Sequence, residues 1–256
     1  MDNIELVFSE IFISLSIMFL LILGVFKKDS SKIIHNISLV VLLATAVITF
    51  NETIGVGQIT LFNQSFIIDY LSSFMKIITL LSAFIVLSIS SSYLNTFKLF
   101  KIEYPILILS SVLGMMVMIS SNDLIVFYMG LELQSLALYV LATFNRDQLK
   151  SSEAGLKYFV LSALSSGLLL YGCSLIYGFT GSTNFNVIAS QFNTNEYALT
   201  FGIVFILVGL SFKISAVPFH MWAPDVYEGS PTSVTLLFTM VPEVAALTVF
   251  IGFLYV

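Results

Sequence analysis

Eight apolar stretches, most of them about 20 residues long, follow one another along this chain. A segment of that length and composition crosses the hydrocarbon core of a bilayer as an α-helix. The stretches lie at roughly 9–26, 33–50, 71–92, 105–121, 124–144, 156–178, 198–222 and 232–256. Strands of a membrane β-barrel would instead alternate apolar and polar residues over segments of about ten residues, and the sequence shows no such alternation. We therefore predict an all-α membrane protein with about eight transmembrane helices.

Composition supports this fold class and excludes several functions. Hydrophobic residues make up 58% of the chain and charged residues only 10%, whereas a soluble domain carries about 25% charged residues. A net charge of −5 argues against a nucleic-acid partner. The sequence has no glycine-rich phosphate loop and no cysteine or histidine cluster with metal spacing. We therefore expect no metal or cofactor in this chain.

Charges between the spans predict the orientation in the membrane. Basic residues follow the first, third and fifth spans, and they are Lys27, Lys28, Lys32, Lys98, Lys101, Arg146 and Lys150. The opposite loops hold acidic residues and no basic one, and these are Asp2, Glu5, Glu52, Asp69, Asp123 and Glu196. Basic loops stay on the inner side of a membrane. We therefore expect both termini of this chain on the outer face of the membrane.

Three ionisable side chains lie deep within predicted spans: Glu132, Lys213 and Glu243. Charge at membrane depth is costly and usually marks a pathway for ions or protons. Glu132 follows Asp123 by nine residues, a depth of about 13 Å along a helix, and Glu243 reaches a similar depth from the other side. We expect the two carboxyls and the amine to share one layer, where a lysine with a changing partner can bind and release a proton. A static ion pair that only fixes helix register is the alternative.

A break is predicted beside this layer. Pro218 denies its helix one hydrogen bond, and broken spans in transporters usually line a cavity. His220 lies seven residues after Lys213, and an imidazole exchanges protons near neutral pH. His220 is therefore a candidate to pass protons between Lys213 and the inner face, and a structural, hydrogen-bonded histidine is the alternative.

Two other lysines lie within predicted spans. Lys157 opens the sixth span four residues after Glu153, which makes an i,i+4 ion pair plausible. Lys157 is a candidate member of a proton path, and a lysine that snorkels to the interface is the alternative. Lys76, near the outer end of the third span, is predicted to snorkel.

Four segments resemble a known family, and they are "SSNDLIVFYMGLELQSLALYVLATF", "SSEAGLKYFVLSALSSGLLLYG", "LVGLSFKISAVPFHMWAPDVYEGSPTSVT" and "VPEVAALTVF". They are similar to the subunit N family of the bacterial proton-pumping NADH:quinone oxidoreductase, respiratory complex I, whose mitochondrial counterpart is NADH dehydrogenase subunit 2. The resemblance covers most of residues 105–256. The earlier spans match mainly in hydropathy and order.

The resemblance implies an antiporter-like subunit of the complex I membrane arm, which couples quinone reduction elsewhere to proton translocation. Glu132 and Lys213 match two residues at the core of the family's proton path. Lys157 matches a further family lysine that opens the sixth span, and His220 matches the histidine after the break, so all four are candidates for the path. The resemblance also implies a bacterial inner membrane, with the mitochondrial inner membrane as the alternative. NADH, FMN, iron–sulfur clusters and quinone are expected in other parts of the complex. The implied partners are other membrane-arm subunits, both antiporter-like and small multi-helix ones, together with the lipid bilayer.

Two departures from the family pattern are present. Glu243 follows Val241 and Pro242 where the family has a lysine, so the sign of the charge is inverted. The family has two inverted five-helix repeats, and only the first, spans 4 to 8 with the broken seventh helix, is found here. The resemblance therefore implies three N-terminal helices in residues 1–104 and one proton-translocation repeat in residues 105–256, with the second repeat missing, as in a partial chain.

Two other functions stay open. A subunit of a multi-subunit cation/proton antiporter would share the buried lysine and glutamate. A structural membrane-arm subunit without its own proton path would fit the missing repeat and the acidic Glu243.

Overall fold

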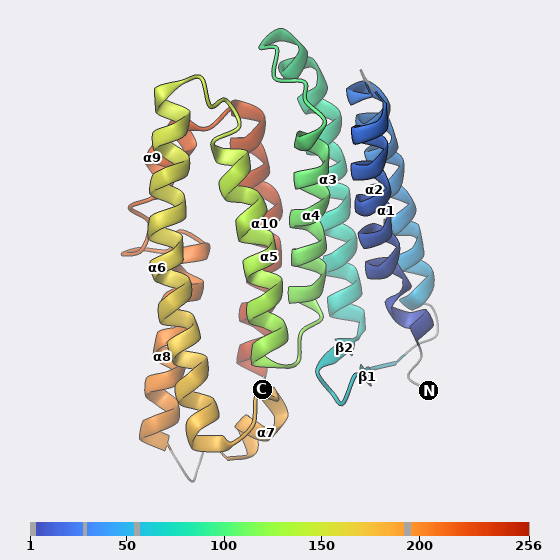
Figure 1. Cartoon of the computed structure of the whole chain (residues 1–256). Helices are drawn as coiled ribbons and strands as arrows, with labels where there is room; N and C mark the ends of the chain where they lie inside the picture. The colour runs from blue at the N-terminus through green and yellow to red at the C-terminus, as the bar shows by residue number, and fades with distance from the viewer. Residues whose placement is uncertain (1–3, 28–29, 54–56, 192–195, 256) are drawn as a thin grey trace.

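The computed structural model describes residues 4–27, 30–53, 57–191 and 196–255; Asp2 and Lys28, which contributed to the predicted orientation, lie outside them. The helices are η1 (Ile4–Val7), α1 (Phe8–Phe26), α2 (Ser31–Thr53), α3 (Tyr70–Thr96), α4 (Glu103–Ile119), α5 (Leu124–Ala142), α6 (Leu149–Thr180), α7 (Phe185–Ser190), α8 (Glu196–Lys213), α9 (Ala223–Gly229) and α10 (Thr232–Tyr255). The long helices stand side by side, with α1 to α3 at one end of the row, α6 and α8 at the other, and α5 and α10 between them (Figure 1). The predicted all-α fold is confirmed.

Among the described residues, six helices are long and apolar enough to cross a membrane, and they belong to α1, α2, α3, α5, α6 and α10. The other two predicted spans are shorter. Helix α4 has 17 residues, about 26 Å at 1.5 Å per residue. The apolar part of α8 is Leu199–Lys213. It is shorter than the predicted span because the helix ends at Lys213, well before the predicted limit at residue 222.

A small hairpin, β1 (Ile59–Leu61) and β2 (Phe66–Ile68), was not predicted. Its turn has three consecutive residues with positive φ, Phe62, Asn63 and Gln64. No glycine marks this turn, which is why the sequence gives little warning of it. The N–H of Ile67 donates to the carbonyl of Ser120 at 2.8 Å, so the hairpin is tied to the connection between α4 and α5.

Helices α4 and α5 approach each other closely through two glycines. A Cβ on Gly114 would lie 2.8 Å from the carbonyl oxygen of Gly130, and a Cβ on Gly130 would lie 2.9 Å from that of Gly114. Asp123 caps the start of α5 by accepting from the N–H of Ile125 at 2.8 Å. These contacts fix the position of α5, the helix that carries Glu132.

Candidate functional site

Helix α8 ends at Lys213 through a specific backbone arrangement. Ser215 adopts the left-handed conformation with φ of 53°. The N–H of Ala216 donates to the carbonyl of Ser211 at 2.9 Å, and the N–H of Ser215 donates to that of Phe212 at 3.2 Å. These two bonds make a Schellman termination. The predicted break in the seventh span is therefore present, and it begins directly after the candidate lysine.

The segment after the break packs back onto the bundle. Pro218 lies within this non-helical segment. The indole Nε1 of Trp222 donates to the carbonyl of Phe212 at 2.9 Å, a second hydrogen bond to a carbonyl in the last turn of α8. Trp222 also stacks on Tyr158 of α6, with ring centroids 4.6 Å apart. The broken end of α8 is thereby held against α6.

The side chain of Lys213 extends into a group of hydroxyls from α5 and α6. Its Nζ donates to three oxygens: Ser135 Oγ at 2.8 Å, Tyr139 OH at 3.2 Å and Ser162 Oγ at 2.6 Å. The Tyr139 hydroxyl donates to Ser162 at 2.6 Å, and the Ser135 hydroxyl donates to the carbonyl of Leu131 at 2.6 Å. An ammonium has three N–H donors, and each finds an acceptor here. The site can hold a charged lysine with no carboxylate in contact.

Glu132 lies on the same helix as two of these hydroxyls but does not contact the lysine. Among the described residues, Lys213 forms no ion pair. The Glu132 carboxylate is nevertheless close enough to act on Lys213 electrostatically. Its Oε1 is buried and has no hydrogen-bond partner in the described part of the chain. The expected pair is therefore open in this structure, with each charge on its own helix.

Glu243 and His220 are not joined to this group by direct contacts. Glu243 is half-buried in α10 and acts electrostatically on Tyr227 of α9. His220 is exposed in the non-helical segment. Over the described ranges, neither side chain has a hydrogen bond or ion pair with Lys213, and no group of three or more histidine, cysteine or acidic residues could hold a metal ion.

Lys157 forms two ion pairs near the start of α6. Its Nζ lies 2.9 Å from Glu153 Oε1 and 2.7 Å from Asp225 Oδ2, so the predicted i,i+4 contact is confirmed. A parallel pair joins Lys150 to Glu228 at 3.1 Å. These side chains are largely exposed, and such pairs contribute little stability. These ion pairs instead fix the position of α9, because they join it to α6 beyond the break.

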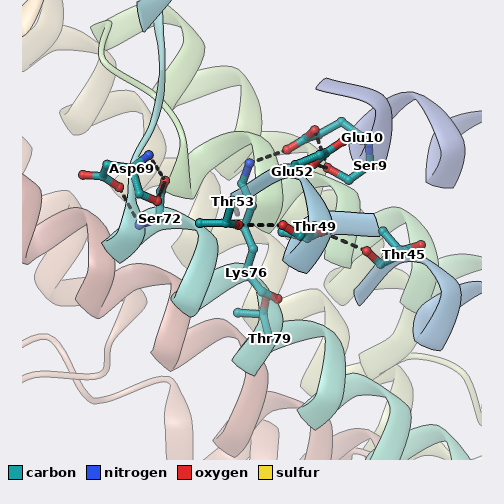
Figure 2. A network of polar contacts seen from close by, with 10 residues as sticks. All are labelled: Ser9, Glu10, Thr45, Thr49, Glu52, Thr53, Asp69, Ser72, Lys76 and Thr79. Carbon is teal, nitrogen blue, oxygen red and sulfur yellow. Dashed lines mark hydrogen bonds and ion pairs between the residues drawn. The ribbon is translucent and has the colours of Figure 1, made fainter. Parts of the chain in front are cut away.

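The prediction that Lys76 snorkels to the interface is wrong. It is 2% exposed, and its Nζ lies 2.5 Å from Glu10 Oε1 of α1. The lysine does not snorkel, because a carboxylate is available inside the bundle. Figure 2 shows Lys76, Glu10 and Glu52 meeting from three different helices. Sequence reasoning missed this set because Glu52 was assigned to an outer loop, whereas α2 extends to Thr53 and includes it.

Comparisons with known proteins agree with this architecture. Residues 121–256 match the family described as NADH:quinone oxidoreductase/Mrp antiporter, TM. All 256 residues align at 72% identity with NADH-quinone oxidoreductase subunit N from Pelagibacter ubique (strain HTCC1062), of which they cover 54%. The chain spans about half the length of the curated relatives it matches.

Two solved structures share the fold. Respiratory complex I from Thermus thermophilus with bound Aureothin includes a chain that is 28% identical with a TM-score of 0.80, and the match covers 94% of this chain and 52% of that one. The Mrp complex from Dietzia sp. DQ12-45-1b includes a chain that is 22% identical with a TM-score of 0.79, covering 97% and 49%. The predicted antiporter-like fold is confirmed.

Proposed function

The chain belongs to the NADH:quinone oxidoreductase/Mrp antiporter transmembrane family, and on that premise we propose that it acts within a membrane-arm subunit of a proton-pumping NADH:quinone oxidoreductase. The identity of 72% with a subunit N supports this assignment. The alternative of a cation/proton antiporter subunit has weaker support, because the matching Mrp chain is only 22% identical. In this proposal other subunits transfer electrons from NADH to quinone, and this chain translocates protons.

The observation that carries the proposal is the open arrangement of Lys213 and Glu132. A lysine bound by three hydroxyls, with a carboxylate nearby but not in contact, has two alternative sets of partners. Contact with Glu132 would favour the charged lysine, and separation would remove that preference. Glu132 Oε1 has no hydrogen-bond partner among the described residues and could accept the lysine or a proton. Movement of Lys213 between these partners would therefore change how strongly it holds its proton.

The remaining members of the proposed proton path are Lys157, His220 and Glu243. His220 is exposed beyond the break and would exchange protons with the inner side. Lys157 and its two carboxylate partners would keep α9 in place beside that entrance. Glu243 would offer a carboxyl proton site where the family has a lysine. Residues 1–104 would form the three-helix N-terminal part and residues 105–256 the translocation repeat.

The proposed location is a bacterial inner membrane, with the start of α1 and the end of α10 on the periplasmic face. Both lie at the same end of the bundle as the hairpin (Figure 1). Partners would be the antiporter-like and small multi-helix subunits of the membrane arm. NADH, FMN, iron–sulfur clusters and quinone would be held elsewhere in the complex, so this chain would contribute to a translocase without its own redox site.

Purification of the tagged full-length protein from its native membrane tests the assignment. We expect it to carry redox subunits with it and the preparation to reduce quinone with NADH. Recovery with antiporter subunits and sodium–proton exchange, but no NADH oxidation, would favour the antiporter alternative instead.

A further inference from the structure

A second set of titratable side chains lies outside the proposed proton path, where α1, α2 and α3 meet near the hairpin (Figure 2). Lys76 is 2% exposed and Glu10 is 5% exposed, and Glu52 is half-buried. These low exposed fractions place Lys76 and Glu10 inside the bundle, and Lys76 lies about 9 Å along α3 from its first residue. The family match begins only at residue 121 and does not include these helices.

Ser9 joins the two carboxyl groups. Its Oγ lies 2.9 Å from Glu10 Oε2 and 2.8 Å from Glu52 Oε2, and its backbone N–H donates to Glu52 Oε1 at 2.9 Å. A serine hydroxyl has one proton to donate. If both carboxyls were ionised, this one proton would have to be shared between them, or one pair of oxygens would lie close with no hydrogen between them. Both distances are full two-centre hydrogen bonds only when one carboxyl is protonated and donates to Ser9 Oγ.

Charge balance leads to the same state. The Lys76 ammonium contacts Glu10 Oε1 at 2.5 Å, and the ring of Phe66 lies 5.1 Å from Nζ on another side. Two ionised carboxyls would leave this buried set with one excess negative charge. One protonated carboxyl makes it neutral, which poorly solvated surroundings favour.

Other charged groups near these helices do not change this balance. Asp69 is the N-cap of α3, seven residues before Lys76, and its side chain accepts from the N–H of Ser72 at 2.7 Å. Glu5 of η1 is exposed. Strands β1 and β2 contain no titratable residue. Among the described residues, Glu10 and Lys76 are the charged groups that act on Glu52 most directly.

We propose that Glu10, Ser9 and Glu52 form a proton-binding site in which two carboxyls share one proton through the Ser9 hydroxyl, with Lys76 as the fixed countercharge. The proton can change sides without leaving the site. Glu52 Oε2 gives its proton to Ser9 Oγ, while the proton of Ser9 passes to Glu10 Oε2. Ser9 stays neutral, and the negative charge moves from Glu10 to Glu52. This inference does not depend on the function proposed for Lys213.

Infrared spectroscopy of the full-length protein in lipid tests the proposal, because a protonated carboxyl has its own C=O stretching band. At neutral pH we expect the wild-type protein to show a component of this band that is lost in Glu52→Gln and is equally lost in Glu10→Gln. Glu5→Gln is the matched control, because it removes an exposed carboxyl close by and should leave the band unchanged. A band that persists unchanged in either Glu52→Gln or Glu10→Gln would overturn the proposal.

Ser9→Ala gives a second test that keeps both carboxyls and Lys76. Without the Ser9 hydroxyl, the protonated carboxyl loses its hydrogen-bond acceptor, so its C=O band should move to higher frequency. A band at the wild-type frequency would show that no carboxyl proton is bound to Ser9. Neither result involves proton pumping, so failure here and failure of the proposed function can be told apart.

Discussion

Replacing Glu10 with glutamine probes the energetics of the buried set around Lys76. The two side chains of the ion pair are 3% and 6% exposed and lie 2.5 Å apart. Removing one partner of such a buried pair costs about 3–5 kcal/mol, because the remaining charge has no compensation. Glu52 belongs to the same network through Ser9 and can ionise to supply the missing charge. We therefore expect Glu10→Gln to cost about 3 kcal/mol, the low end of that range.

The double variant Glu10→Gln/Glu52→Gln removes this compensation. Lys76 then has no carboxylate in its network, and we expect the loss to rise to about 5 kcal/mol. Glu52→Gln alone should cost no more than about 1 kcal/mol. In that variant the glutamine oxygen can still accept from the Ser9 N–H, and its amide can donate to the Ser9 hydroxyl.

Equilibrium unfolding of the full-length protein in detergent, followed by circular dichroism, measures these free energies of unfolding. We expect the wild type and Glu52→Gln to have similar free energies of unfolding, Glu10→Gln to be clearly less stable, and the double variant to be the least stable. If Glu10→Gln matched the wild type, or if the double variant were no less stable than Glu10→Gln, the assigned network would be wrong.

Three further outcomes are expected. Ser162→Ala removes a hydrogen-bond acceptor that lies 2.6 Å from Lys213 Nζ. A hydrogen bond to a charged group is worth about 1.5–3 kcal/mol, so the proton-to-electron ratio of the complex should fall. An unchanged ratio would show that Ser162 is not part of the site. Glu243→Gln should impair pumping more than Glu243→Lys, which restores the family pattern, and equal losses would exclude a relay role. Gly130→Ala places a Cβ 2.8 Å from the backbone of α4 and should lower the free energy of unfolding by about 1–3 kcal/mol. The control Gly167→Ala places a Cβ in open space and should not destabilise the protein. Similar effects of the two changes would contradict the close contact between α4 and α5.

Six of the eight predicted spans and the break could be predicted because each depends on local sequence. Long apolar runs determine which segments are helical in a membrane, and Pro218 indicates where the seventh span cannot continue. The exact end of α8 was less predictable. It depends on a left-handed Ser215 in a position that glycine usually occupies.

The two polar sets depend on contacts between distant helices, and the sequence does not show which side chains meet. Lys76 is 66 residues from Glu10, and each alone has the features of a charge near a span end. Serines are common in these spans, so nothing singled out Ser135 and Ser162 as acceptors for Lys213. The lysine itself was predictable because a charge within an apolar run is rare.

The proton-to-electron ratio of the assembled complex carrying Lys213→Met tests the central claim most directly. Methionine keeps a long, flexible side chain but cannot bind a proton. In sealed membrane vesicles oxidising NADH, we predict fewer protons moved per electron than in the wild type, while Lys101→Met, at an exposed lysine, keeps the wild-type ratio. A wild-type ratio in Lys213→Met would contradict the account and favour a purely structural role for this chain.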